Sequence, residues 1–488
     1  MQRRTFLGVT GAALTAGLGG RGGTAPTVPD TALLLKLLED RPRVRIPSEL
    51  VGLIRSGLGF EPLLAALTLA AVRNVQPYPD VGFKYHAVMV LQSVHLTTAG
   101  SSPEDRWLPA VWAADYFKQT QAAERRQTGW RMPARPAVRS GDPERARRSL
   151  VAALDSWDRD AADAAVVEYA AVADPGALVA PLLPYGARDL RAIGHKAIAV
   201  QNAHRLVGLL GCEQAEPILR SAVAALQNAG DDPNPAANDL PADRPWAANR
   251  ERLASIPASW RSGREDAGAR TALLRALREV SEEEAGAAIV EHLRSGVAPA
   301  TIWEALFAAA AELIVRLPGI VPVHAQTTAN ALHYIYRVSS DDQDRQLAML
   351  QCGAFLSMFR RLVGNAGAGF RLEALEPLAL DGPVGDAIDE IFSDMPDRRS
   401  RAVGKTLAYL LGGGDAGALI ARSRHHLARN VIGSHDYKFA EAAFENAAHV
   451  GDEAWRARLL AAGMAYLRGP APSPPNAAVE EAVELLRA

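Results

Sequence analysis

The chain has 488 residues, of which 48% are hydrophobic and 22% charged, so it has the composition of a folded protein and the length for one large or two medium cores. Its 53 Lys and Arg nearly balance 55 Asp and Glu, and this near-zero net charge argues against nucleic acid as a partner. Only two cysteines are present, Cys212 and Cys352. They exclude a disulfide framework and a cysteine-rich zinc site, so a metal would need nitrogen and oxygen ligands.

Residues 1–30 resemble a twin-arginine export signal and the linker that follows it. Arg3 and Arg4 precede Phe6-Leu7 and a weakly apolar run over residues 9–20, with a candidate cleavage site at residues 23–25. This run is too short and too rich in glycine for a stable membrane span. The resemblance implies the twin-arginine translocase as a partner, a periplasmic or extracellular location, and a protein that folds before export.

Beyond residue 30 the pattern predicts an all-α fold. Apolar residues recur at three- and four-residue spacing, for example over 33–38, 63–72, 149–157 and 272–280, and no segment alternates with period two. Glycine- and proline-rich breaks fall at 132–143, 229–246, 412–417 and 469–475. We therefore expect one helical body over residues 31–488 without significant sheet, crossed by a loop at 229–247.

A solenoid-like arrangement is an alternative for part of this body. Residues 174–183, 193–210 and 215–226 resemble stacked helical pairs, but no constant period extends over three units. We expect packed antiparallel helices that are partly solenoid-like. An exported helical-repeat binding protein with purely structural histidines is the corresponding functional alternative.

The histidines carry the strongest chemical signal. Six of the 11 form pairs nine residues apart, and at about 100° per residue the two rings of a pair lie on opposite sides of a helix. Only one member of each pair can face a common site. The pairs are His86 with His95, His195 with His204, and His324 with His333.

The first member of each pair is the better candidate for a shared site. His86, His195 and His324 share their helix faces with apolar or small residues, and each follows a break near the start of a helix. The breaks are at Gly82, Gly194 and Pro322. Three inward-facing histidines at helix starts could converge, whereas a single buried histidine is more often a hydrogen-bonded core residue.

A fourth segment, residues 433–442, places His435 and Lys438 on one helix face, with Ser434 as the expected N-cap. An unpaired buried ammonium is costly and, having only donors, cannot ligate a metal. Carboxylated by carbon dioxide, Lys438 would become an anionic oxygen ligand. The structural alternative is that Lys438 reaches solvent or pairs with Asp436 or Glu441.

These four segments resemble a known family. YHAVMVLQSVH, IGHKAIAVQNAH, VPVHAQTTANAL and SHDYKFAEA are similar to the histidine-bearing helices of the questin oxidase-like proteins, all-helical non-haem iron oxygenases whose fungal members open anthraquinone-type rings. The resemblance implies Fe(II) held by His86, His195, His324 and His435, with carboxylated Lys438 as a further ligand. It also implies dioxygen and a quinone-like or other aromatic small molecule as substrates.

The residues themselves leave the metal and the reaction open. Imidazole and oxygen ligands suit iron, zinc, copper or nickel, and the same ligands could support a metal-dependent hydrolase. His204 or His333 would replace its partner if a helix were offset. The sequence contains no nucleotide-cofactor motif and no nucleophile elbow.

Overall fold

The computed structural model describes residues 30–77, 82–138, 141–227, 233–235 and 237–488, and the predicted export signal lies outside them. All regular secondary structure in these residues is helical, apart from one isolated bridge between Arg264 and Val297. The predicted all-α fold is therefore confirmed. No helix in the described ranges has the length and apolar character needed to cross a membrane.

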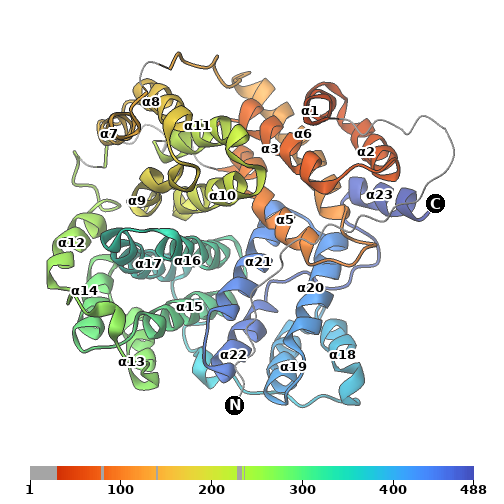
Figure 1. Ribbon diagram of the computed structural model, residues 1–488. Coiled ribbons are helices and arrows are strands. Elements are labelled where there is room, and N and C mark those ends of the chain that lie inside the picture. Colours follow the sequence, from red (N-terminus) through yellow and green to blue (C-terminus); the bar gives the residue numbers. More distant parts are fainter. Residues whose placement is uncertain (1–29, 78–81, 139–140, 228–232, 236) are drawn as a thin grey trace, which may run out of the picture.

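The first part of the chain forms the upper half of Figure 1, from α1 to α11. Its helices are α1 (Thr31–Asp40), α2 (Ile46–Arg55), α3 (Phe60–Asn74), α4 (His86–Met89), α5 (Leu91–Ala99), α6 (Leu108–Gln127), α7 (Pro143–Asp155), α8 (Arg159–Val172), α9 (Leu183–Ala187), α10 (His195–Leu210) and α11 (Ala215–Leu226).

The rest of the chain forms the lower half and then returns upward. Its helices are α12 (Arg244–Arg252), α13 (Ala267–Leu277), α14 (Glu282–Arg294), α15 (Pro299–Arg316), α16 (Ile320–Val338), α17 (Asp342–Val363), α18 (Ala387–Asp394), α19 (Arg399–Leu411), α20 (Ala416–Asn430), α21 (Ser434–Ala448), α22 (Glu453–Gly463) and α23 (Ala477–Arg487).

Helices form where the apolar spacing predicts them, with small differences at their ends. Residues 33–38 lie in α1 and 63–72 in α3, whereas α7 ends at Asp155 and α13 at Leu277, before the expected boundaries. Beyond α7, Trp157 has a left-handed backbone with φ of 62°, which ends the helical path. Periodicity marks the apolar face of a helix better than the residue at which it stops.

Helices that follow one another in sequence pack as pairs, which is the solenoid-like part of the prediction. α7 packs on α8, α16 on α17, and α18 on α19. The C-terminal α23, however, packs against α2 and α6 near the start of the described chain, as Figure 1 also shows. This contact closes the body, whereas the ends of an open solenoid touch only their neighbours.

The core depends on small residues that let helices approach closely. In α15, Ala305, Ala308, Ala310 and Ala311 are fully buried. Larger side chains such as Phe307 fill the remaining space between the helices.

One predicted break and both cysteines differ in how far the structure follows the sequence pattern. The crossing loop expected at 229–247 is shorter, because α12 begins at Arg244 and Pro245 occupies its first turn, where proline is favoured. Its described part spans 233–235 and 237–243. Cys212 is exposed, Cys352 is buried, and the two do not form a disulfide.

Candidate metal centre

Four histidines from distant parts of the chain meet at one point. The closest ring nitrogens of His86, His195, His324 and His435 all lie within 4.8 Å of one another. Ring centroids trace a closed circuit, with separations of 4.9 Å from His86 to His195, 4.7 Å to His324, 4.9 Å to His435 and 4.5 Å back to His86. These are the four histidines that the sequence singled out.

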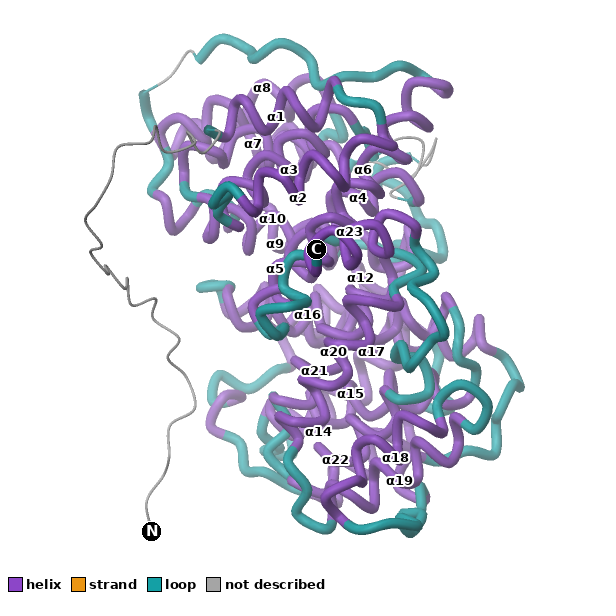
Figure 2. The backbone as a smooth tube through the Cα atoms, turned by 90° about the vertical axis from the view of Figure 1, so that its right-hand side faces the viewer, coloured by secondary structure: helices purple, strands orange, loops and turns teal. Residues whose placement is uncertain are grey.

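Each histidine stands near the start of its helix. His86 and His195 are the first residues of α4 and α10, His435 is the second of α21, and His324 is the fifth of α16. Contacts of α10 with α4 and α16, and of α16 with α21, bring the four starts together. Figures 1 and 2 both show α10, α16 and α21 in the middle of the molecule. Pro322 lies inside the first turn of α16 and does not precede the helix.

Backbone carbonyls orient two of the rings. His86 Nδ1–H donates to the carbonyl of Gly82 at 2.8 Å, and His324 Nδ1–H donates to the carbonyl of Ile320 at 2.7 Å. Each acceptor is four residues before its histidine. Because Nδ1 keeps the proton, the Nε2 lone pair of each ring faces the centre, as metal-binding histidines require.

The inward Nε2 atoms form two close pairs. His86 Nε2 is 3.0 Å from His435 Nε2, and His195 Nε2 is 2.8 Å from His324 Nε2. With both lone pairs of His86 and His324 directed inward, His435 and His195 donate Nε2–H across these contacts. For His435 and His195 to bind a cation through Nε2 as neutral rings, the ring proton would move from Nε2 to Nδ1.

A strained turn directly before α10 positions His195 in the site. Ala192, Ile193 and Gly194 all have positive φ, at 52°, 44° and 85°. A left-handed conformation is especially unfavourable for the β-branched Ile193, and strain of this kind concentrates at functional sites. A Cβ at Gly194 would lie 1.9 Å from Thr328 Oγ1, so this position also requires glycine for space.

The four imidazoles are neutral. Burial, followed by the charge of Lys438, lowers the pKa of His324 to about 3 and that of His435 to about 2. The same two causes lower the pKa values of His86 and His195 well below the usual range. Neutral imidazole is the ligand form of histidine, so the site is ready to bind a cation at neutral pH.

Lys438 is buried beside the four rings without a partner. Its side chain is 3% exposed, and its Nζ atom makes no hydrogen bond. Burial lowers its pKa to about 7, so much of it is a neutral amine at neutral pH. The structure thus places all five predicted site residues in one buried region.

Neighbouring acids do not neutralise Lys438. Asp436 pairs with Arg468 at 2.9 Å, and Glu441 pairs with Arg424 at 2.6 Å. The alternative in which Lys438 pairs with either acid is therefore wrong. The expected N-cap is also wrong, because α21 begins at Ser434 and the Asp436 carboxylate accepts from the Gly433 N–H at 3.0 Å. The glycine exposes this N–H, and Asp436 is placed to accept it.

The second histidine of each pair lies elsewhere. His204 Nδ1 is 2.9 Å from Tyr334 Oη, and the ring of His95 lies 5.9 Å from that of Phe60. His333 packs against Trp303 with ring centroids 4.7 Å apart. None of these three rings belongs to the four-histidine cluster, so no helix is offset.

The donor set fits a divalent cation. Four neutral nitrogens converge, two of them held in the correct tautomer, and a partnerless amine lies close by. Sequence reasoning missed the strained turn at 192–194 and the carbonyls of Gly82 and Ile320. The i−4 position of both carbonyls was a usable signal, whereas no sequence pattern indicates a left-handed isoleucine.

Comparison with known proteins finds no protein family, no curated protein and no solved structure that matches this chain.

Proposed function

We propose that this protein is a metal-dependent oxidoreductase, a non-haem iron oxygenase that oxidises a quinone-like or other aromatic small molecule. The observation that carries the proposal is the convergence of four neutral imidazoles, three buried and one half-buried, beside a partnerless lysine. His86, His195, His324 and His435 would hold the ion. It would supply Lewis acidity and, as iron, one-electron chemistry with dioxygen.

Carboxylated Lys438 would complete the ligand set. The neutral amine attacks the carbon of carbon dioxide, an N–C bond forms, and one amine proton leaves to solvent, which gives a carbamate anion. Burial favours the reactive neutral amine, and a nearby cation would stabilise the anionic product. Asp436 and Glu441 form ion pairs with arginines, which leaves Lys438 as the residue that can supply the oxygen ligand.

Iron, dioxygen and an aromatic substrate are proposed from the resemblance of the four histidine segments to the questin oxidase-like proteins. Exposed apolar residues near the site support an apolar substrate. His435 is the least buried of the four histidines. Ile320, whose carbonyl orients His324, is 51% exposed, and Ile432, three residues before His435, is 63% exposed.

Anaerobic reconstitution with Fe(II), followed by an oxygen-uptake assay with hydroxyanthraquinones, tests the proposal. We expect about one iron per chain, a complement that depends on the intact ligand set. His195→Ala should lose both iron and oxygen uptake, whereas His204→Ala, on the same helix but bonded to Tyr334, should keep both. Stoichiometric zinc with ester hydrolysis and no oxygen uptake would contradict the oxygenase.

We also propose export through the twin-arginine pathway, with a periplasmic or extracellular location. Paired guanidinium groups at Arg3 and Arg4 are the feature that the export receptor reads. Changing both to Lys should leave folded protein in the cytoplasm, measured by cell fractionation. Undiminished export of this double variant would contradict the proposal.

A further inference from the structure

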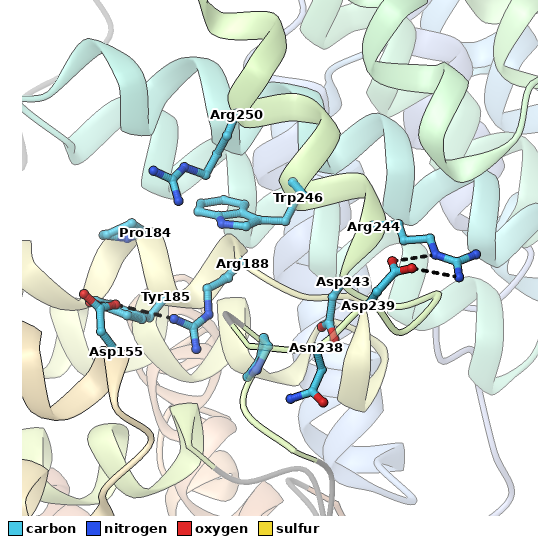
Figure 3. Close-up of a pocket in the computed structure, with 12 residues that line it drawn as sticks. Asp155, Pro184, Tyr185, Arg188, Asn238, Asp239, Asp243, Arg244, Trp246 and Arg250 are labelled. Atoms are coloured by element: carbon cyan, nitrogen blue, oxygen red, sulfur yellow. Dashed lines mark hydrogen bonds and ion pairs between the residues drawn. The ribbon is translucent and has the colours of Figure 1, made fainter.

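A cavity of about 530 Å³ lies between α9 and α12, apart from the four histidines (Figure 3). Pro184, Tyr185 and Arg188 line it from α9 and the end of that helix, and Trp246 and Arg250 line it from α12. None of its lining residues belongs to the candidate metal centre. Its volume is in the range of small-molecule sites.

Arg188, which lines this cavity, has a guanidinium that is only partly satisfied. The residue is only 6% exposed, its Nη1 atom is 3.7 Å from an Asp155 oxygen, and its Nη2 atom has no hydrogen-bond partner. The guanidinium carbon lies 5.1 Å from the centroid of the Tyr185 ring. A buried donor without an acceptor costs free energy, and a ligand oxygen would remove that cost.

The carboxylates that line the cavity already have partners. Asp239 pairs with Arg244 at 2.8 Å, and Asp243 pairs with Arg191 at 2.5 Å. Asp155 accepts from the Tyr185 hydroxyl at 2.7 Å. Asp239 and Asp243 are thus neutralised by arginines, whereas Asp155 keeps its charge and offsets part of that of Arg188.

Arg250 is a second cation in the cavity wall. Within the described ranges it has no ion-pair or hydrogen-bond partner, and its side chain is exposed toward the cavity that it lines. Figure 3 shows Arg250 and Trp246 on one side of the cavity and Arg188 and Tyr185 on the other. Two guanidiniums on opposite sides favour one anionic group between them.

We propose that this cavity is a second ligand site, which binds a small organic anion with a planar ring. The anionic group, a carboxylate or phosphate, lies between Arg188 and Arg250, and the ring lies against the Trp246 indole. Arginine forks suit both anions, and the aromatic wall favours a flat ring over an aliphatic chain. This site is independent of the proposed oxygenase activity.

Isothermal titration calorimetry with 1-naphthoate tests the proposal, with 1-naphthamide as the ring without charge and acetate as the charge without a ring. We expect 1-naphthoate to bind with a Kd below about 1 mM and both controls to bind at least about 10-fold more weakly. Equal affinities for 1-naphthoate and 1-naphthamide, or no heat from 1-naphthoate, would overturn the proposal.

Variants separate a built site from general surface charge. Arg250→Ala, which removes a charge-assisted hydrogen bond, and Arg188→Lys, which replaces the planar arginine fork by a single ammonium, should each weaken 1-naphthoate about 10-fold. Arg244→Ala is the matched control on α12, since Asp239 already holds that guanidinium. An equal loss at Arg244 and Arg250 would overturn the proposal. His435→Ala should bind 1-naphthoate normally, so failure here is distinguishable from failure of the metal centre.

Discussion

Two buried lysines show how the same side chain can be structural or chemical. Lys405 is 2% exposed and contacts Glu390 at 2.5 Å, Asp394 at 2.8 Å and Asp381 at 3.0 Å. Burial alone would lower its pKa, but hydrogen bonds to these acids outweigh burial and raise it. Lys438 is equally buried and has no such partner. An unpaired buried amine with a lowered pKa is a candidate functional group.

The first prediction is that Lys438 carries a carbamate in the metal-loaded protein. Incubation with carbon-13 bicarbonate should give a carbamate signal by NMR that is absent from Lys438→Arg, since arginine keeps its charge and is not carboxylated. Lys438→Ala should lose metal affinity, with partial recovery in added acetate. Lys196→Arg is the control, because Lys196 is buried but paired with Asp189 at 2.7 Å. Full metal content in Lys438→Arg would contradict the carbamate.

The second prediction concerns pH and the carboxylate that faces Lys405. Hydrogen bonds from Lys405 and from the Asp381 backbone N–H lower the pKa of Glu390 to about 2. Since the folded pKa lies below the unfolded value of about 4.3, this group stabilises the fold above that value. The contribution is lost as the pH falls through about 2.

Thermal unfolding of Glu390→Gln over a pH series measures this contribution. The variant should be less stable than the parent at pH 7 by about 1–2 kcal/mol, with the difference vanishing toward pH 2. Asp389→Asn, one residue away and paired with Arg422 at the surface, should change little. A difference at pH 7 that persisted unchanged at pH 2 would show that Glu390 acts through packing.

At the scale of elements, the site depends on how four helices begin. The imidazoles lie within the first five residues of α4, α10, α16 and α21, so the loop before each helix helps to set the direction of the side chain. For α10 this loop is the left-handed turn at residues 192–194. Such a turn persists only because its surroundings hold it, as Thr328 does by packing over Gly194.

The third prediction is that Gly194→Ala weakens both the fold and the metal centre. The added Cβ would meet Thr328 Oγ1 at 1.9 Å in a backbone with φ of 85°, so we expect a loss of at least about 1–3 kcal/mol. Unfolding by denaturant and metal analysis measure the two effects. Thr328→Ala in the same chain should recover part of both.

Gly413→Ala is the matched control for this substitution. Its φ of 84° is nearly the same, but no atom lies within 4 Å of the added Cβ, so only backbone strain of about 1 kcal/mol applies. Metal content should not change in this variant. If Gly194→Ala and Gly413→Ala lost equal stability and kept equal metal content, the turn at residues 192–194 would not be what positions His195 for metal binding.

At the scale of the whole molecule, the four histidines connect segments that are 349 residues apart, from His86 to His435. A bound ion would therefore crosslink α4 and α10 of the upper half with α16 and α21. The unfolded chain lacks this arrangement, so binding free energy adds to folding free energy.

The fourth prediction is that removing metal lowers stability. At a free metal concentration of about 100 times Kd, a single site adds about 2.7 kcal/mol, and this gain should disappear with a chelator. Calorimetric melting with and without chelator measures it. His324→Ala should melt at the same temperature in both conditions, and a chelator effect that survived in this variant would place the metal elsewhere.

Some features of the protein follow from local sequence. Apolar spacing determines the all-α fold because an amphipathic helix must bury one face. The nine-residue spacing allows only one histidine of each pair to face a common site, and the apolar neighbours and preceding breaks select His86, His195 and His324. The fourth segment, residues 433–442, adds His435 and Lys438. None of this reasoning depends on contacts between distant residues.

Only the tertiary structure decides whether those five side chains meet, and which neighbours they find. Asp436 and Glu441 are the acids nearest to Lys438 in the sequence. In the fold they pair with Arg468 and Arg424 instead, so neither forms an ion pair with Lys438. The closure of α23 onto α2 and α6, and the cavity between α9 and α12, are likewise contacts between distant segments. Local periodicity predicts which face of a helix is buried, but the packing of the whole chain determines which other helix covers that face.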